Sequence, residues 1–250
     1  IETAVKSGTN ALISDEYDKK VLIDIQPAIG EAIENFVWNG AKTATKSAIA
    51  LLSPGAAQGS ISAGAQTLVA AMPTNLMDSI PATILYNISQ AKSTPGAGLG
   101  DYIKVLSIAG SVTYLNIADE YAKMYLGAPQ KVTANKSNPP RIFAPLEDLA
   151  MIKTANNQSG VATNQNFLIE GSGKGEKVSY NGCEITFVPL VGFRILCNPI
   201  YLKVLMDLVY DLSSLQVGPV ANGAQMRWYK NILAIRTWVT NQRYITLYGG

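Results

Sequence analysis

Residues 14–38 carry the periodicity that most restricts how this chain can fold. Apolar side chains recur there at every fourth position: Tyr17, Val21, Ile25, Ile29, Ile33 and Val37. One stripe of this kind predicts an amphipathic helix, with Ser14 as its N-cap and Asn39-Gly40 as its end. Such a helix would span roughly 37 Å. Because Pro27 lies inside it, we predict one long bent helix, or alternatively two shorter helices that meet at Gln26-Pro27.

Further helices are predicted through the first two-thirds of the chain. We expect a short helix that ends at Leu52, a helix that begins at Pro81 and runs to about Lys92, and helices over 101–109, 116–126 and 146–155. Loops are expected over 53–64 and over the glycine-rich stretch 93–100. A short apolar run occupies 141–144.

Strand patterns dominate the last third of the chain. Residues 178–180 and 183–188 flank Asn181-Gly182, which predicts a β-hairpin. Another strand is expected over 193–197. Residues 226–239 and 243–248 are rich in β-branched and aromatic side chains, and we expect two strands joined as a hairpin through Asn241-Gln242. Helices followed by antiparallel strands indicate an α+β fold.

Composition excludes several classes of function. The chain has 250 residues, a net charge of +2, and 15% charged residues, so it lacks the general attraction to phosphate of a basic nucleic-acid binder. It has no histidine, which excludes Ser-His-Asp and Cys-His catalysis and the usual zinc sites. Cys183 and Cys197 are expected to be reduced core residues of an intracellular protein, with a single disulfide as the alternative. No stretch predicts a transmembrane helix, and the first ten residues lack the pattern of a signal peptide.

The local motifs that could carry chemistry are better explained as structure. The glycines of 96–100 follow a predicted helix and do not fit a dinucleotide-binding loop, and residues 171–175 lack the spacing of a phosphate-binding loop and fit a hairpin tip. Four carboxylate pairs, Asp15/Glu16, Glu31/Glu34, Asp119/Glu120 and Glu147/Asp148, are expected to face solvent or another subunit. The basic and aromatic cluster 227–230 would alternate between the two faces of a strand, so packing or subunit contact is expected there.

The order of elements carries more information than any single motif. A long helix ends in Trp38-Asn39-Gly40. Residues 141–153 (RIFAPLEDLAMIK) and 167–169 (FLI) follow much later, then 180–189 (YNGCEITFVP), and last 228–236 (WYKNILAIR) and 244–247 (YITL). This series resembles the major capsid proteins of tailed bacteriophages, which share the Hong Kong 97 fold. Residues 14–40 would match the spine helix of that family, 141–169 its helix-and-loop block, 178–189 its hairpin and 226–247 its long strands.

The resemblance implies a long spine helix across an antiparallel sheet, together with an axial domain of helices and sheet. Residues 1–40 and 201–250 would form the peripheral domain, and 41–200 mainly the axial domain. It also implies a structural subunit without enzymatic activity and without cofactor or metal. Its partners would be copies of itself in hexamers and pentamers, with packaged DNA contacted only non-specifically, no membrane and no small-molecule substrate. Its location would be the virion, assembled in the bacterial host cytoplasm.

The resemblance also places the contacts between subunits. Candidate contacts lie on the spine helix and the long strand: Glu31, Glu34, Arg227, Lys230, Asn231 and Arg236. Some members of the family join subunits by a Lys–Asn isopeptide bond, and Asn231 falls at the acceptor position. Trp238 replaces the acidic residue that this reaction requires, and only 13 residues precede the spine helix, so we predict no crosslink.

Two other hypotheses stay open. An encapsulin-like protein compartment shares the architecture and differs in its cargo. A protein of another class, either a hydrolase or transferase that uses one of the carboxylate pairs or a monomeric binding module, would not form very large closed assemblies.

Overall fold

The computed structural model describes residues 27–28, 30–54, 61–93, 104–106, 111–134, 139–157, 167–171, 176–206, 216–219, 227–230, 235–240 and 245–249. By internal contacts the chain divides into two compact units. One comprises residues 1–34 and 204–236, and the other comprises 35–203 and 237–250. The assignment of segments to peripheral and axial domains stays a prediction.

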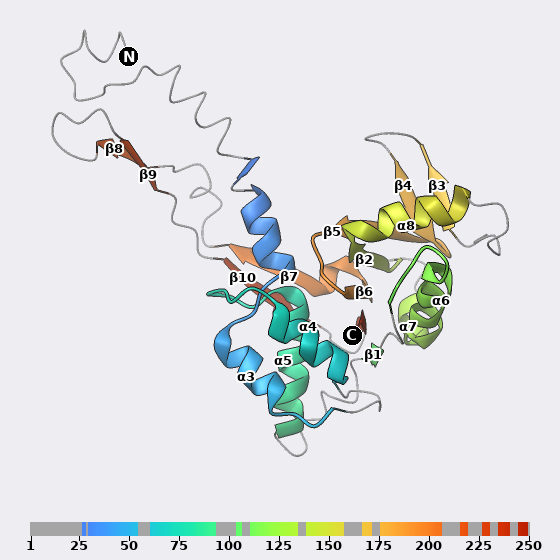
Figure 1. Ribbon diagram of the computed structural model, residues 1–250, viewed down its shortest axis with the longest axis horizontal. Coiled ribbons are helices and arrows are strands. Elements are labelled where there is room, and N and C mark those ends of the chain that lie inside the picture. Colours follow the sequence, from blue (N-terminus) through green and yellow to red (C-terminus); the bar gives the residue numbers. More distant parts are fainter. Residues whose placement is uncertain are drawn as a thin grey trace, which may run out of the picture. The chain divides into compact units, whose positions relative to one another are not determined.

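A mixed seven-stranded sheet organises the larger unit (Figure 1). Its order is β1 (Lys104–Leu106), β11 (Ile245–Gly249), β6 (Phe193–Cys197), β2 (Arg141–Pro145), β5 (Cys183–Val188), β4 (Lys177–Tyr180) and β3 (Phe167–Glu170). The β1–β11 and β2–β5 pairs are parallel, and the other neighbouring pairs are antiparallel. The predicted α+β class is therefore confirmed, whereas the expectation that antiparallel strands gather in the last third of the chain is corrected. Parallel pairing requires crossovers, and here they bring β1 and β2 into the sheet.

Two helices pack on one face of this sheet. Helix α6 (Ile117–Gly127) contacts β1 and β11, helix α8 (Leu146–Asn157) contacts β2 and β5, and the two helices contact each other. Figure 1 shows α8 lying along β2 and β5. Beneath these helices the rings of Tyr121, Phe167 and Tyr180 meet with centroids 4.9 to 5.7 Å apart. On the opposite face Phe143 of β2 contacts the ring of Trp38, with centroids 5.1 Å apart. Strands β6 and β11 are consequently buried along their whole length.

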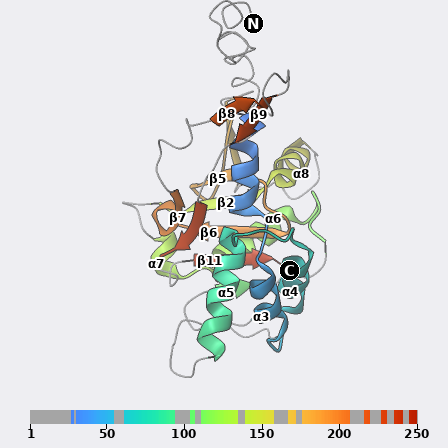
Figure 2. The same cartoon turned by 90° about the vertical axis from the view of Figure 1, so that its left-hand side faces the viewer.

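A second group of helices comprises α3 (Thr43–Ala50), α4 (Ala63–Ala71) and α5 (Ile80–Ser93), which lie side by side in Figures 1 and 2. Helices α3, α5, α6 and α8 agree with the predicted ones. Helix α4 was not predicted. The loop expected over 53–64 ends earlier, because Ser62 accepts a hydrogen bond from the Ala65 N–H and the helix begins at Ala63. The short helix α7 (Gln130–Thr133) and the 3-10 turn Pro199–Tyr201 complete these elements.

Several local predictions are confirmed. Asn181 and Gly182 both adopt positive φ, +48° and +78°, and turn β4 into β5 as the sequence predicted. The helix over 30–38 ends at Trp38, and Gly40 has φ +145°. A Cβ at Gly40 would lie 1.9 Å from the Asn75 amide nitrogen, so this position requires glycine. The part of the predicted spine helix before residue 27 lies outside the described residues.

Two predictions at the sheet edges are wrong. Residues 101–109 were expected to be helical, but 104–106 form strand β1 and pair with β11. The predicted hairpin through Asn241-Gln242 does not form, because β10 (Ile235–Val239) pairs with β7 (Leu202–Met206) while β11 joins the large sheet. Between residues 226 and 239 the structure describes β9 (Arg227–Lys230), which pairs with β8 (Gln216–Pro219), and β10.

Both cysteines are free and buried, as predicted. Burial raises the pKa of the Cys183 thiol to about 11, and raises that of Cys197 further. Among the described residues, no helix is both long enough and apolar enough to cross a membrane.

Candidate functional site

The most distinctive group of polar side chains in the larger unit is a buried ion pair between α8 and the sheet. Asp148 accepts two hydrogen bonds from Arg194, one from Nε and one from Nη2, both 2.6 Å long. The Tyr121 hydroxyl on α6 donates a third, 2.8 Å long, to the same carboxylate. All three residues are at most 2% exposed. Three elements that are distant in sequence are thereby joined at one carboxylate.

Local sequence explains the position of Asp148. Strand β2 ends at Pro145 and α8 begins at once, so Glu147 and Asp148 occupy its first turn, where the helix dipole favours a negative charge. Asp148 precedes Ile152 and Ala155 at helical spacing, and all three are buried on one face of α8. Glu147 is one position away and is exposed.

Burial and charge act together on the ionisable groups of this cluster. Burial, followed by the charge of Asp148, raises the pKa of the Tyr121 hydroxyl well above its ordinary value. Burial by itself would lower the pKa of Arg194, but the hydrogen bonds and charge of Asp148 outweigh it, and the pKa rises. Tyr121 is therefore a neutral donor and Arg194 a permanent cation.

A second buried carboxylate lies beside the first. Glu120 on α6 accepts a hydrogen bond from the Tyr248 hydroxyl and one of 2.7 Å from Lys123 Nζ. Arg194 and Tyr248 are paired residues of β6 and β11, so both clusters lie on the same face of the sheet. Burial and the Glu120 hydrogen bond raise the pKa of Tyr248. The two carboxylates therefore join α6 and α8 to adjacent strands.

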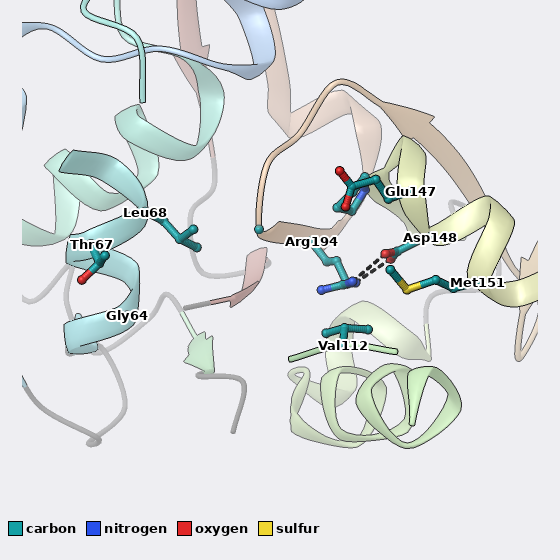
Figure 3. A pocket seen from close by; sticks show the side chains of 10 residues that line it. Gly64, Thr67, Leu68, Val112, Glu147, Asp148, Met151 and Arg194 are labelled. Carbon is teal, nitrogen blue, oxygen red and sulfur yellow. Dashed lines mark hydrogen bonds and ion pairs between the residues drawn. The ribbon is translucent and has the colours of Figure 1, made fainter. Parts of the chain in front are cut away.

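A pocket of about 440 Å3 opens against this ion pair (Figure 3). Its walls come from α4, from the segment before α6, from the start of α8 and from β6, and the lining residues are Gly64, Thr67, Leu68, Val112, Pro145, Glu147, Asp148, Met151, Gly192 and Arg194. Gly192 has φ +71°, and the Leu68 side chain lies so close that a Cβ there would be 2.6 Å from it. No sequence pattern indicates this pocket, because its lining residues are spread from position 64 to position 194.

The arrangement offers little acid–base chemistry. Both oxygens of Asp148 and both oxygens of Glu120 already accept hydrogen bonds, and the two tyrosines are held neutral. Among the described residues, no group of three side chains suitable for holding a metal ion occurs. The remaining donor of the cluster is Arg194 Nη1, which is buried and has no hydrogen-bond partner among the described residues.

The expectation that the carboxylate pairs face solvent or another subunit is wrong for one member of each of two pairs. Glu120 is 2% exposed and Asp148 is 1% exposed, whereas Asp119 and Glu147 are exposed. The burial of Glu120 could have been predicted from the sequence, because Glu120 shares a helical face with buried Ile117 and Met124. Asp15 and Glu16 lie outside the described residues.

The predicted subunit contacts fall on two separate parts of the chain. Glu31 and Glu34 are exposed on the helix over 30–38, and Arg236 is exposed on β10. Arg227 and Lys230 are the two ends of β9, opposite Pro219 and Gln216 of β8. Asn231 lies outside the described residues. The structure brings none of these described residues into the buried cluster, and their role in subunit contact stays a prediction.

No model of a known protein family matches this sequence. A search of curated proteins likewise finds no matching sequence.

Proposed function

We propose that this chain is a structural subunit of a closed protein shell of the Hong Kong 97 type, a bacteriophage capsid, and that it carries no catalytic activity. The shell would form because copies of the chain pack head to tail around five- and six-fold axes, so that rotation closes the assembly. The resemblance in the order of sequence elements is the origin of this proposal.

The observation that carries the proposal is the path of the chain between its two units. The first unit combines the start of the chain with a late segment, 1–34 with 204–236, and the second holds the long middle segment. The resemblance leads to a similar division, with 1–40 and 201–250 in a peripheral domain and 41–200 mainly in an axial domain. Residues 237–250 depart from it, because they belong to the second unit and strand β11 lies in its large sheet. This agreement supports the capsid interpretation over a single-unit enzyme.

Three exposed leucines are candidate positions for contacts with neighbouring copies. Leu51, Leu76 and Leu126 are 86%, 98% and 82% exposed in the larger unit. Because single exposed apolar residues are common on monomers, these leucines do not by themselves distinguish a shell subunit from a monomer. The carboxylates considered for a hydrolase do not favour that alternative, because Glu120 and Asp148 are engaged in buried contacts.

Electron microscopy of the full-length gene product, with its mass distribution measured by mass photometry, tests this proposal. We expect closed particles of many copies with five- and six-fold vertices. A monomer or dimer at every concentration would overturn it. Nucleic acid inside particles would support a capsid, and protein cargo would instead identify an encapsulin-like compartment.

Charge reversals test the predicted contacts. Glu31→Lys and Arg236→Glu change exposed side chains and should reduce the yield of closed particles at least about tenfold, because like charges across a contact are repulsive. Asp119→Lys is the matched control, since Asp119 is an exposed carboxylate outside the predicted contacts. Equal yields from all three variants would remove these residues from the interface.

A further inference from the structure

One residue that lines the pocket against the buried ion pair, Arg194, has a hydrogen-bond donor that is covered by neighbouring atoms and has no partner among the described residues. Two nitrogens of the Arg194 guanidinium bind Asp148, and the third, Nη1, is buried without a partner among the described residues. Figure 3 shows that this nitrogen points away from Asp148, toward the side on which Leu68 lies. A buried donor without an acceptor is unfavourable, because it has given up its hydrogen bond to water and gained none in return. The pocket therefore favours a ligand that supplies an acceptor oxygen.

The remaining walls of the pocket indicate what surrounds that oxygen. Leu68, Val112 and Met151 provide aliphatic surface, and Gly64 and Gly192 add only backbone atoms to the lining. A volume of about 440 Å3 lies within the range of small-molecule sites. The acceptor oxygen would thus be attached to an aliphatic group of modest size.

The charges at the pocket argue against an anion. Arg194 contributes one positive charge, and Asp148 and Glu147 contribute two negative charges, so the lining carries a net charge of −1. The charge of Arg194 is already compensated by Asp148 at 2.6 Å. This net negative charge would repel a carboxylate or a phosphate, whereas a neutral carbonyl group carries no net charge to be repelled.

We propose that this pocket binds a neutral amide group that carries an aliphatic substituent. The amide oxygen accepts a hydrogen bond from Arg194 Nη1, and the substituent packs against Leu68, Val112 and Met151. Because Nη1 is covered in the unliganded protein, a side chain of the wall rotates to admit the oxygen, as is common on binding. This inference does not depend on shell assembly.

Binding of two matched probes to the full chain tests the proposal. N-acetyl-leucine N′-methylamide is neutral, and N-acetyl-leucine differs by carrying a carboxylate. Solution NMR would follow the Arg194 side-chain Nε–H and the backbone N–H groups of Gly64 and Gly192 during titration. We expect the neutral probe to bind with a Kd on the order of 1 mM, as its small size implies, and the anionic probe at least about fivefold more weakly. Absence of binding by the neutral probe, or tighter binding by the anionic one, would overturn the proposal.

A pair of threonine variants localises the binding. Thr67 lines the pocket, is exposed, and donates its hydroxyl to the Ala63 carbonyl one helical turn earlier. Thr154 on α8 is also exposed and donates in the same way to Ala150, but it does not line the pocket. Thr67→Phe should weaken the neutral probe at least about tenfold, and Thr154→Phe should leave its affinity unchanged. Equal affinities for both variants would contradict the site.

A crystal structure with the neutral probe provides a second measurement that does not depend on the variants. A carbonyl oxygen within hydrogen-bond distance of Arg194 Nη1 would support the proposal, and a water molecule alone at that nitrogen would overturn it. A dilution series without probe then identifies the source of the amide. Concentration-dependent shifts of the same resonances indicate a segment of a second copy, and their absence indicates a small molecule.

Discussion

Two ion pairs on one sheet have the same length and very different surroundings. Arg194 lies 2.6 Å from Asp148, and Arg141 of the neighbouring strand β2 lies 2.6 Å from Glu184. The side chains of the first pair are 3% and 1% exposed, and those of the second are 39% and 48% exposed. Equal distances therefore hide unequal energetic roles, because a buried charge that loses its partner cannot recover hydration, whereas an exposed one can.

The largest effect is expected when the buried pair is broken. Asp148→Ala leaves Arg194 without a compensating charge in a dry interior and should lower the free energy of unfolding by about 3–5 kcal/mol. Urea denaturation of both proteins measures this difference.

A double variant separates the cost of leaving one charge without its partner from the contribution of the ion pair itself to the free energy of unfolding. Asp148→Leu combined with Arg194→Met removes both charges, and it should recover most of the lost stability, because buried pairs are often replaceable by apolar side chains. A loss below about 1 kcal/mol for Asp148→Ala would contradict the distinction between the two pairs.

The adjacent carboxylate should show an intermediate effect. Tyr248→Phe keeps the ring and deletes the hydroxyl that donates to Glu120, so a buried oxygen loses one partner. We expect the free energy of unfolding to fall by about 1–3 kcal/mol. Tyr114→Phe, at a tyrosine that is 36% exposed, should change stability by less than about 0.5 kcal/mol. If both variants lost similar amounts of unfolding free energy, burial would not determine how much a tyrosine hydroxyl contributes to stability.

The buried thiols extend the comparison to pH. Burial raises the pKa of Cys183 from 9.0 to about 11, so between these values the folded chain holds a proton that the unfolded chain has released. Stability from this group is complete below about pH 9 and is lost as the pH rises to about 11. Under reducing conditions, wild type should therefore lose stability more steeply than Cys183→Ala over this interval, by at most about 1.4 kcal/mol per pH unit. The free energy of unfolding is measured by urea denaturation at each pH. If it fell equally with pH in wild type and in Cys183→Ala, the Cys183 thiol would not be buried and neutral.

The smallest effect belongs to the exposed pair. A double-mutant cycle with Arg141→Ala and Glu184→Ala should give a coupling of about 0.2–1 kcal/mol, and added salt should reduce it. A coupling that exceeds about 2 kcal/mol, or one that is insensitive to salt, would show that the exposed pair contributes to stability in the same way as the buried pair.

Features that depend on neighbouring residues were predictable from the sequence, and features that depend on distant residues were not. The Asn181-Gly182 turn, the end of a helix at Trp38 and the start of α8 after Pro145 depend on neighbouring residues, and each was predicted. The partners of β1, β10 and β11 depend on contacts across the chain. The pattern predicted a helix where β1 lies, and it paired the strands of β10 and β11 with each other incorrectly. The candidate site shows the same difference. Asp148 was predicted only as one member of a carboxylate pair that faces solvent or another subunit, and no sequence pattern indicated Arg194.

Local sequence patterns were enough to predict an α+β chain, the helices α3, α5, α6 and α8, the hairpin at Asn181-Gly182 and two buried thiols. These features depend on composition, turn chemistry and periodicity, which act over a few residues. Packing of the whole chain sets which carboxylate is buried in the pairs Asp119/Glu120 and Glu147/Asp148, and which strands run parallel. It also leaves one buried guanidinium nitrogen of Arg194 without an acceptor among the described residues. Those features depend on side chains brought together from positions 120, 148, 194 and 248, and chain packing sets their distances and their burial.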